Sequence, residues 1–547
     1  MTGARAILTA LLLIHGGAVR GEEPPPDFVL GVQTHFQQGW STLLIGEAKQ
    51  LGAPALRDEL DWHKIEATKG VYDFSDVDRY MKRVFENGLK PLIVITDSNP
   101  LYDDGHTPYS KSGITGLSAY ISAIFSHYGT GNLQIEIGNE VNSDDFVSGP
   151  FVRDKPTYLA ATVRGVRERL RADHPDAQII CAGLNTIAIG FLQTFFRRGG
   201  LQACDAISVH PYRDNPDTVL TELTRLKTLM REYGGEKPIY VTEFGKWFDD
   251  PAEAPDYMVM MVAQMAAAGV REAYWYALID EPWWPNMGLL EKDGTTAKPA
   301  ADAFRLLQAR LLPLGRPVPR SDLPTVRLFE FGSGGKGFVA WGSGARLQVT
   351  GQGAYFDTRG RTVPAVTNLS DEPVIILGDG LDVSVELQRS VADTKYQYNQ
   401  LPWSYFALRP DIGLTPLETM DWDWTSYRGA PDLSPLQVGD NWITTARFQG
   451  RPYHAIERFT ASETGDYRVD GWWRASDKTE PSRLIIRHNR KTVFEIPEIT
   501  SERFSLSGLK LTLKAGDSLD FELAPTGPDG AGSVQRRIQV FGPPSNN

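Results

Sequence analysis

The first part of the chain alternates short apolar runs with longer segments of helical periodicity. Eight such runs lie between residues 28 and 312, at 28–32, 54–56, 91–96, 133–138, 178–183, 206–209, 238–242 and 272–278. Continuous apolar runs separated by helices are typical of a parallel sheet covered by helices. Eight such units in about 285 residues match a closed (β/α)8 barrel. A doubly wound open sheet is the alternative, but no Gly-x-Gly-x-x-Gly motif follows the first run.

The pattern changes after residue 312. Four prolines punctuate the next segment, at positions 313, 317, 319 and 324. Residues 325–390 then show short segments in which apolar and polar residues alternate, separated by glycine-rich turns. The remaining C-terminal region shows the same alternation. We therefore expect an α/β protein with a (β/α)8 TIM barrel over 22–315, a small β-sandwich domain over 316–395 and an all-β, jelly-roll-like sandwich over 396–547.

Residues 1–21 are typical of a secretory signal peptide. Arg5 precedes a short apolar stretch over 6–14, and Val19, Arg20 and Gly21 form a tolerable cleavage site. An uncleaved anchor is the alternative. No other stretch approaches the length of a membrane span, so we expect a periplasmic or extracellular protein with no membrane span after cleavage. In that compartment Cys181 and Cys204 either form a disulfide or remain buried thiols.

Charge and composition exclude several classes of function. The chain has 56 Lys and Arg against 68 Asp and Glu, a formal net charge of −12, and no long basic run, so we expect no nucleic-acid partner. The two cysteines rule out a cysteine-rich metal site. The nine histidines form no His-Glu-x-x-His motif, and Gly-x-Ser-x-Gly is absent. The sequence therefore predicts neither a catalytic metal nor another cofactor.

Two glutamates end apolar runs at counted positions of the barrel. Glu140 closes the sequence Ile-Glu-Ile-Gly-Asn-Glu after the fourth run, and Glu243 ends the seventh in Val-Thr-Glu-Phe-Gly. Barrel enzymes build their active sites at the C-terminal ends of the strands. Two carboxyl groups that meet there suit the cleavage of a glycosidic bond. Alternatively, each glutamate caps a helix or pairs with an arginine.

These motifs resemble clan A of the retaining glycoside hydrolases. The resemblance implies that Glu140 is the acid/base, that Asn139 contacts the sugar 2-hydroxyl and that Glu243 is the nucleophile. It also implies a carboxyl separation of about 5–5.5 Å.

Further positions match the same clan. The resemblance implies that Arg57, at the end of the second run, keeps the nucleophile ionised, as a neighbouring cation would. It also implies that His210 and Tyr212 contact the substrate and the nucleophile, and that Trp275 forms the platform under the sugar in the −1 position. His35 follows the first run and either lines the pocket or is structural.

Within the clan, the chain is most similar to family 39. The segments at 62–66, 70–74 and 370–374 carry this resemblance, which spans about 28–390. Family 39 and its relatives include β-xylosidases, α-L-iduronidases and bacterial exopolysaccharide hydrolases. With a signal peptide on an acidic chain, we expect a secreted hydrolase of a bacterial exopolysaccharide. A non-catalytic polysaccharide-binding protein and a transglycosylase of the same pathway are the alternatives.

Aromatic residues supply candidates for sugar binding. Trp283 and Trp284 follow the eighth run and either stack on sugars or pack within their loop; the moderate loops favour an open cleft and endo action. Six of the 13 tryptophans lie in the last region, where some of them could make it a carbohydrate-binding module or simply fill its core: Trp403, Trp422, Trp424, Trp442, Trp472 and Trp473.

Overall fold

The structure, a computed structural model, describes residues 28–543 except for 96–97, 410, 435, 449, 477–480 and 528–531. The expected signal peptide at 1–21 lies outside the described residues. Within the part that is described, no helix is long and apolar enough to cross a membrane.

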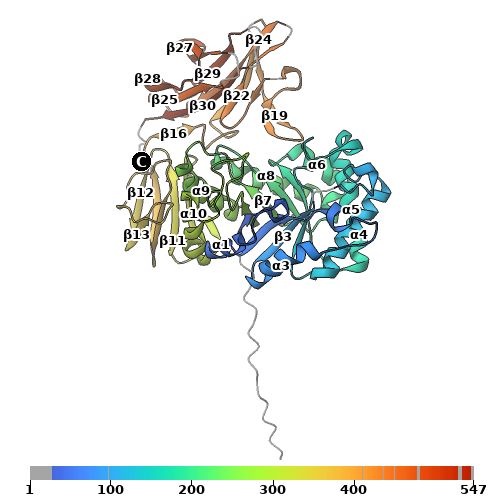
Figure 1. The fold of residues 1–547 in the computed structure, drawn as a ribbon. Coiled ribbons are helices and arrows are strands. Elements are labelled where there is room, and N and C mark those ends of the chain that lie inside the picture. Colours follow the sequence, from blue (N-terminus) through green and yellow to red (C-terminus); the bar gives the residue numbers. More distant parts are fainter. Residues whose placement is uncertain are drawn as a thin grey trace, which may run out of the picture.

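Eight parallel strands close into a barrel, which confirms the predicted (β/α)8 fold (Figure 1). Each strand pairs with its neighbours in chain order, and β1 closes the barrel by pairing with β8. The strands are β1 Val29–Gln33, β2 Ala55–Glu59, β3 Lys90–Ile95, β4 Gln134–Ile137, β5 Ile179–Asn185, β6 Ala206–His210, β7 Ile239–Phe244 and β8 Val270–Trp275.

Helices follow the strands and cover the outside of the barrel (Figure 1). Two of the longest begin at a side-chain cap: Ser110 accepts from the backbone N–H of Gly113, and Asp154 accepts from that of Thr157. The helices are α1 Leu44–Gln50, α2 Trp62–Ile65, α3 Ser75–Glu86, α4 Lys111–Tyr128, α5 Lys155–Asp173, α6 Ile189–Arg197, α7 Gly200–Ala203, α8 Val219–Glu232, α9 Ala254–Ala267 and α10 Pro299–Leu306.

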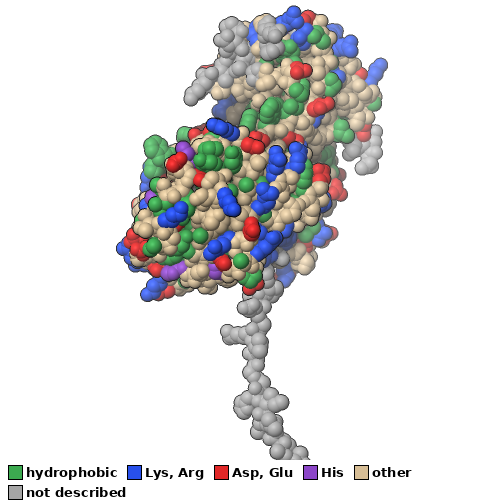
Figure 2. All heavy atoms as spheres, turned by 90° about the vertical axis from the view of Figure 1, so that its right-hand side faces the viewer, with side chains coloured by type: hydrophobic (Ala, Val, Ile, Leu, Met, Phe, Trp, Pro, Cys, Tyr) green, Lys and Arg blue, Asp and Glu red, His purple; other side chains and the backbone are tan. Residues whose placement is uncertain are grey.

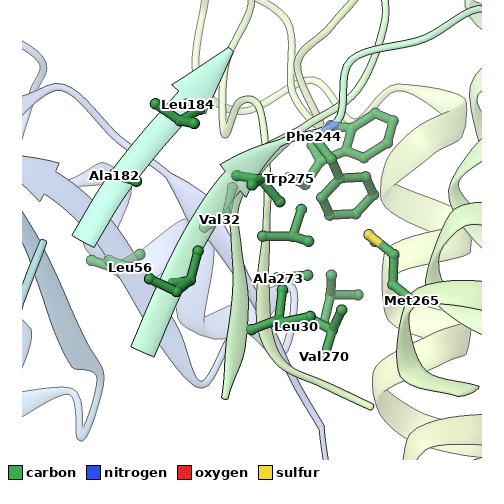
Figure 3. Close-up of a cluster of buried hydrophobic side chains, with 14 of the residues drawn as sticks. Leu30, Val32, Leu56, Ala182, Leu184, Phe244, Met265, Val270, Ala273 and Trp275 are labelled. Carbon is green, nitrogen blue, oxygen red and sulfur yellow. The ribbon is translucent and has the colours of Figure 1, made fainter. Parts of the chain in front are cut away.

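The barrel strands are buried on both faces, so two apolar layers form. The outer layer lies between strands and helices; in Figure 3, Phe244 and Trp275 of the barrel lie beside Met265 of α9. The inner layer is a separate cluster that includes Tyr240 and Tyr274. A disulfide joins Cys181 in β5 to Cys204 just before β6, so these two cysteines are paired.

A small β region follows the barrel. It contains a five-stranded antiparallel sheet in the order β13-β14-β11-β10-β9 and a two-stranded sheet of β12 and β15. The strands are β9 Pro317–Pro319, β10 Val326–Phe331, β11 Gly337–Gly342, β12 Ala345–Thr350, β13 Gly353–Phe356, β14 Val374–Gly378 and β15 Asp382–Leu387.

Two larger antiparallel sheets form the C-terminal sandwich and enclose a second apolar core. The first sheet contains β16 Ser390–Asp393, β19 Glu418–Asp421, β20 Ser426–Gly429, β21 Gln437–Val438, β22 Trp442–Thr444, β25 Gly465–Ala475, β28 Phe504–Leu513 and β30 Ser533–Phe541. The second contains β17 Trp403–Arg409, β18 Gly413–Pro416, β23 Ala446–Phe448, β24 Arg451–Thr460, β26 Ser482–His488, β27 Lys491–Ile499 and β29 Ser518–Pro525. Because β16 pairs with β30, residues 390–393 join this sandwich, although we expected it to begin at 396.

Candidate active site

Glu140 and Glu243 meet at the mouth of the barrel. Glu243 lies within β7, and Glu140 lies three residues beyond the end of β4. An oxygen of each carboxyl group and a ring nitrogen of His210 all lie within 4.8 Å of one another. Both glutamate side chains are nearly buried, with exposed fractions of 12% and 10%. The two carboxyl groups therefore share one cavity.

The backbone after β4 is bent to present Glu140. Gly138 has a φ of +95° and Glu140 itself a φ of +45°, which is uncommon for a residue with a side chain. The backbone N–H of Glu140 donates to the carbonyl of Gly183 in β5, at 2.5 Å. This bond holds the loop in a conformation that would otherwise be costly, as is frequent at functional sites.

Glu243 accepts hydrogen bonds on both carboxyl oxygens. Arg57 donates to Oε1 at 2.5 Å, and the hydroxyl of Tyr212 donates to Oε2 at 2.7 Å. Burial alone would raise the pKa of Glu243. The charges of His210 and Arg57 and the bond from Tyr212 outweigh burial, so the pKa of Glu243 lies below its ordinary value of 4.5. This carboxyl group is therefore ionised near neutral pH.

Arg57 is the hub of the buried polar network. Its side chain is 1% exposed, and it also donates to Glu136 at 2.8 Å, to Gln33 at 2.8 Å and to Asn139 at 2.9 Å. Burial alone would lower the pKa of Arg57. The charges of Glu136 and Glu243 outweigh burial and raise this pKa above its ordinary value, so the guanidinium stays charged. The planar guanidinium group has five N–H donors, so one arginine can hydrogen-bond to all of these partners and hold them in position.

His210 lies between the two glutamates and is fully buried. Its Nδ1 lies 3.2 Å from Glu140 and 3.7 Å from Glu243. Its Nε2 lies 3.0 Å from the hydroxyl of Thr242, which donates to Glu136 at 2.7 Å. Burial lowers the pKa of His210, but Glu243 and the hydrogen bond to Glu140 raise it above its ordinary value of 6.5.

Glu140 has different hydrogen-bond partners from Glu243. Besides His210, its carboxyl group accepts from the Asn185 amide at 3.3 Å, and among the described residues no arginine or lysine bonds to it. The two carboxyl groups therefore differ in their surroundings: Glu243 lies against a cation, and Glu140 does not.

Trp275 does not reach this cavity, so its predicted role as a sugar platform is wrong. The side chain is fully buried, packs on Phe244 and Phe248, and donates from Nε1 to the carbonyl of Met287 at 2.8 Å (Figure 3). Alternation along β8 is the reason. Tyr274 belongs to the inner cluster, so the next side chain points outward to the helices.

Tyr276, the next residue along, presents its ring at the mouth instead. It is half-buried, and its centroid lies 6.3 Å from that of Tyr212 and 5.7 Å from that of His35. Burial and the charge of Glu243 raise the pKa of Tyr276, so its hydroxyl stays neutral. We did not predict this residue from the sequence, although alternation along β8 would have indicated it.

His35 lies beside this ring at the edge of the cavity. Its Nδ1 lies 3.1 Å from Glu59, and its ring makes an edge contact with Trp40 at 5.2 Å. Its Nε2 lies 3.9 Å from Glu281 and has no hydrogen-bond partner among the described residues. His35 therefore lies at the barrel mouth, and its contact with Glu59 helps to hold the ring in place.

Trp283 and Trp284 lie in the loop after β8 and are exposed by 81% and 47%. Trp284 contacts Trp247, which follows β7 and is 57% exposed, edge to face at 6.2 Å. Neither side chain is packed into a core. An exposed aromatic group therefore flanks the mouth on the side of β7 and β8.

The site also contains residues that we did not predict. Glu136, Thr242, Gln33 and Asn185 complete the network around Arg57, His210 and Glu140. Glu136 had a visible signal, because it is a charged residue inside the apolar run of β4. Such a residue is almost never buried without a partner.

Glu140, His210 and Glu243 are close enough to hold a metal ion. A dication there would lie beside the Arg57 guanidinium, 2.5 Å from Glu243, and would compete with it for the same carboxylate. Arg57 already supplies the positive charge that this carboxylate needs. The donor set therefore fits a metal poorly.

Part of the barrel matches a known family model. Residues 168–302 match the family described as "Glycosyl hydrolase catalytic core". This segment includes β6, β7 and β8, and with them His210, Tyr212 and Glu243. This part of the chain is similar to the catalytic core of glycosyl hydrolases. No curated protein matches the chain.

Solved structures of glycoside hydrolases are similar to this chain. A family 39 glycoside hydrolase from the gut symbiont Bacteroides cellulosilyticus WH2 is 19% identical with a TM-score of 0.55, over 64% of this chain and 81% of its own. A monomeric β-xylosidase from Caulobacter crescentus CB15 is 15% identical with a TM-score of 0.45, over 92% of this chain and 98% of its own. At 19% identity, the likeness to the family 39 glycoside hydrolase concerns the fold alone.

Proposed function

We propose that this glycoside hydrolase cleaves O-glycosidic bonds of a polysaccharide with retention of configuration. The observation that supports this most is the approach of Glu140 and Glu243 to within 4.8 Å. Retaining enzymes hold their carboxyl groups about 5–5.5 Å apart, whereas inverting enzymes need about 6.5–9.5 Å to admit a water molecule between them. The short separation favours direct attack by one carboxylate on the sugar.

The surroundings of the two carboxyl groups support different roles for them. Glu243 is ionised beside Arg57, so it attacks the anomeric carbon and forms an ester with the sugar. Glu140 donates its proton to the departing glycosidic oxygen, and the leaving sugar diffuses away as an alcohol. Glu140 then takes a proton from water, the hydroxide attacks the anomeric carbon, and Glu243 is released as a carboxylate.

Neighbouring groups position the two carboxyl groups and the sugar. Tyr212 holds Oε2 of Glu243, and His210 separates the two carboxyl groups while bonding to Glu140. Asn139 is anchored by Arg57 at the mouth, where its amide can reach a sugar hydroxyl. Tyr276 supplies the ring beside the cavity that we expected from Trp275.

For the substrate, we propose a bacterial exopolysaccharide, cleaved outside the cytoplasm and within the chain. The residues at 1–21 and the acidic charge support secretion, and exposed tryptophans beside the mouth suit a long chain in an open cleft. A non-catalytic binding protein would have no need of an acid and a nucleophile in contact. A transglycosylase would use the same residues and differs only in the acceptor.

The test is a panel of purified bacterial exopolysaccharides and 4-nitrophenyl glycosides. Wild type is compared with Glu140→Gln and Glu243→Gln, and with Glu86→Gln, which makes the same change on the exposed face of α3. We expect both site variants to lose at least about a hundredfold in kcat and the control to keep full rate. Near-full hydrolysis by either site variant would overturn the proposal.

Two additions to the assay separate the alternatives. Products are analysed with and without added acceptor sugars, since a transglycosylase would give longer chains. Wild type is also assayed after dialysis against EDTA, and we expect an unchanged rate because Arg57 supplies the charge beside Glu243.

A further inference from the structure

A hairpin of the C-terminal sandwich reaches the mouth of the barrel. It consists of β19 and β20 and the turn between them, and Figure 1 shows β19 pointing towards α6 and α8. Arg225 of α8 forms an ion pair with Asp421 at the end of β19. A Cβ atom on Gly190 of α6 would lie 2.7 Å from the carbonyl oxygen of Asp421, so only a glycine admits the hairpin this closely.

The tip of the hairpin is joined to the loop that carries Glu140. The Asn142 amide donates to the carbonyl of Asp423 at 2.9 Å and to that of Asn185 at 3.0 Å. Asn185 in turn donates to Glu140 at 3.3 Å. Thr186 donates to the carbonyl of Trp424 at 2.5 Å. Two hydrogen-bonded residues therefore separate the C-terminal sandwich from the carboxyl group that protonates the leaving oxygen.

The main chain makes these contacts, and the indole rings remain free of them. Trp422 is 46% exposed and Trp424 is 52% exposed, although both lie at a contact between two parts of the molecule. Trp403 and Trp473 of the same sandwich are 4% and 0% exposed and fill its core. Both indole rings are therefore accessible to a ligand at this place.

A cavity of about 310 Å³ lies beside the hairpin, between barrel and sandwich. Figure 2 shows the sandwich as a lobe that projects from the barrel. Residues of both parts line the cavity, among them Tyr212, Thr186 and Arg225 of the barrel and Tyr398, Tyr427 and Trp442 of the sandwich. Tyr212 also donates to Glu243, so this lining residue connects the cavity wall to the catalytic centre.

We propose that the sugar residues on the leaving-group side of the cleaved bond bind at this junction, with Trp422 and Trp424 as stacking surfaces. The proposal rests on the proposed function. Glu140 donates its proton to the leaving oxygen, so the departing sugars lie on the side of Glu140, where the hairpin is anchored. Sugar rings present apolar C–H faces that pack on aromatic planes, and their hydroxyls suit a polar cavity. The C-terminal sandwich is then part of the active site and not a separate binding module.

The experiment replaces both tryptophans in the full chain by Trp422→Ala and Trp424→Ala. The probes are the polysaccharide and the 4-nitrophenyl glycoside that wild type hydrolyses fastest in the panel above. The aryl glycoside has a small leaving group that does not reach the hairpin. We expect kcat/KM on the polysaccharide to fall about tenfold, mainly through KM, and kcat/KM on the aryl glycoside to stay within about twofold of wild type.

Ile412→Ala is the control variant, because it removes a 66% exposed apolar side chain from the β17–β18 turn of the same sandwich. It should leave both activities unchanged. Equal losses on both probes, or no loss on the polysaccharide, would overturn the proposal. Wild type that hydrolyses neither probe would instead refute the proposed function, and with it this site.

Discussion

Arg57 lies 2.5 Å from Glu243 and donates a second hydrogen bond to Glu136, so one buried cation serves two buried carboxylates. Burial raises the pKa of Glu243, but the charges of His210 and Arg57 outweigh burial and lower this pKa below 4.5. The acid limb of the pH–rate profile should therefore lie below pH 4.5 in wild type. The Arg57→Lys variant lacks the planar set of N–H donors of the guanidinium group. We therefore expect the acid limb of its pH–rate profile to move to higher pH. A kcat/KM profile from pH 3 to pH 8 measures it; an unchanged limb would contradict the assigned role of Arg57.

The same pKa shift makes a prediction about stability. A carboxyl group whose pKa is lower in the folded state stabilises the fold at pH values above its unfolded pKa, and this contribution is lost as the pH falls through the folded pKa. For Glu243 that loss begins near its ordinary value of 4.5 and continues below it. In Glu243→Gln, we expect the free energy of unfolding to fall less steeply with acid than in wild type. Urea unfolding at pH 7 and at pH 4 measures the difference, and identical slopes would argue against it.

Tyr212→Phe removes one hydrogen bond to Glu243 and nothing else from the network. Burial and the charge of Glu243 raise the pKa of Tyr212 well above 10, so the phenol is a neutral donor throughout the working range. A hydrogen bond to a charged group is worth about 1.5–3 kcal/mol, so we expect kcat to fall by about tenfold to a hundredfold. The circular dichroism spectrum should not change. A variant with wild-type kcat would exclude Tyr212 from the reaction.

Trp275 and Tyr276 should respond to substitution in different ways. Trp275 is fully buried in the outer layer, so Trp275→Ala should cost about 3–5 kcal/mol of stability. Trp275→Phe, which keeps more of the packing, should fold and retain kcat/KM. Tyr276 faces the cavity, so Tyr276→Ala should lower kcat/KM at least about tenfold with a smaller loss of stability. The reverse pattern would restore Trp275 as the sugar platform.

The Cys181–Cys204 disulfide joins two neighbouring barrel segments that are 23 residues apart in the sequence. Closing a loop of this size stabilises a fold by about 3 kcal/mol in the chain-entropy model. We expect unfolded protein to resist alkylation until dithiothreitol is added, and the reduced protein to melt at a lower temperature. Labelling of both cysteines without a reductant would show that they are free thiols.

The sequence reveals the barrel and the two glutamates because their signals are local. Apolar runs mark the strands, and Glu140 and Glu243 stand where their strands end. Partners within the site depend on which strands lie side by side. The bond from Thr242 to Glu136 joins β7 to β4 across the barrel, and no spacing in the sequence indicates it.

The mistaken role of Trp275 has a different cause. Successive side chains along a strand point to opposite faces. A prediction that places the strand correctly but is wrong by one residue therefore assigns the wrong aromatic ring to the cavity. The hairpin is harder still, because Asn142 and Asp423 are 281 positions apart. Only the folded chain brings the hairpin that carries Trp422 and Trp424 to the loop that carries Glu140.

The most direct test of the central claim is the configuration of the sugar azide that alanine variants form. Glu140→Ala and Glu243→Ala are incubated with the best aryl glycoside and sodium azide, and the products are examined by proton NMR. If Glu243 is the nucleophile and Glu140 the acid/base, azide restores turnover in both variants. The glycosyl azide from Glu140→Ala then keeps the configuration of the substrate, and that from Glu243→Ala has the opposite one. The same configuration from both variants, or no product from either, would contradict the proposal that these two residues act on one anomeric carbon.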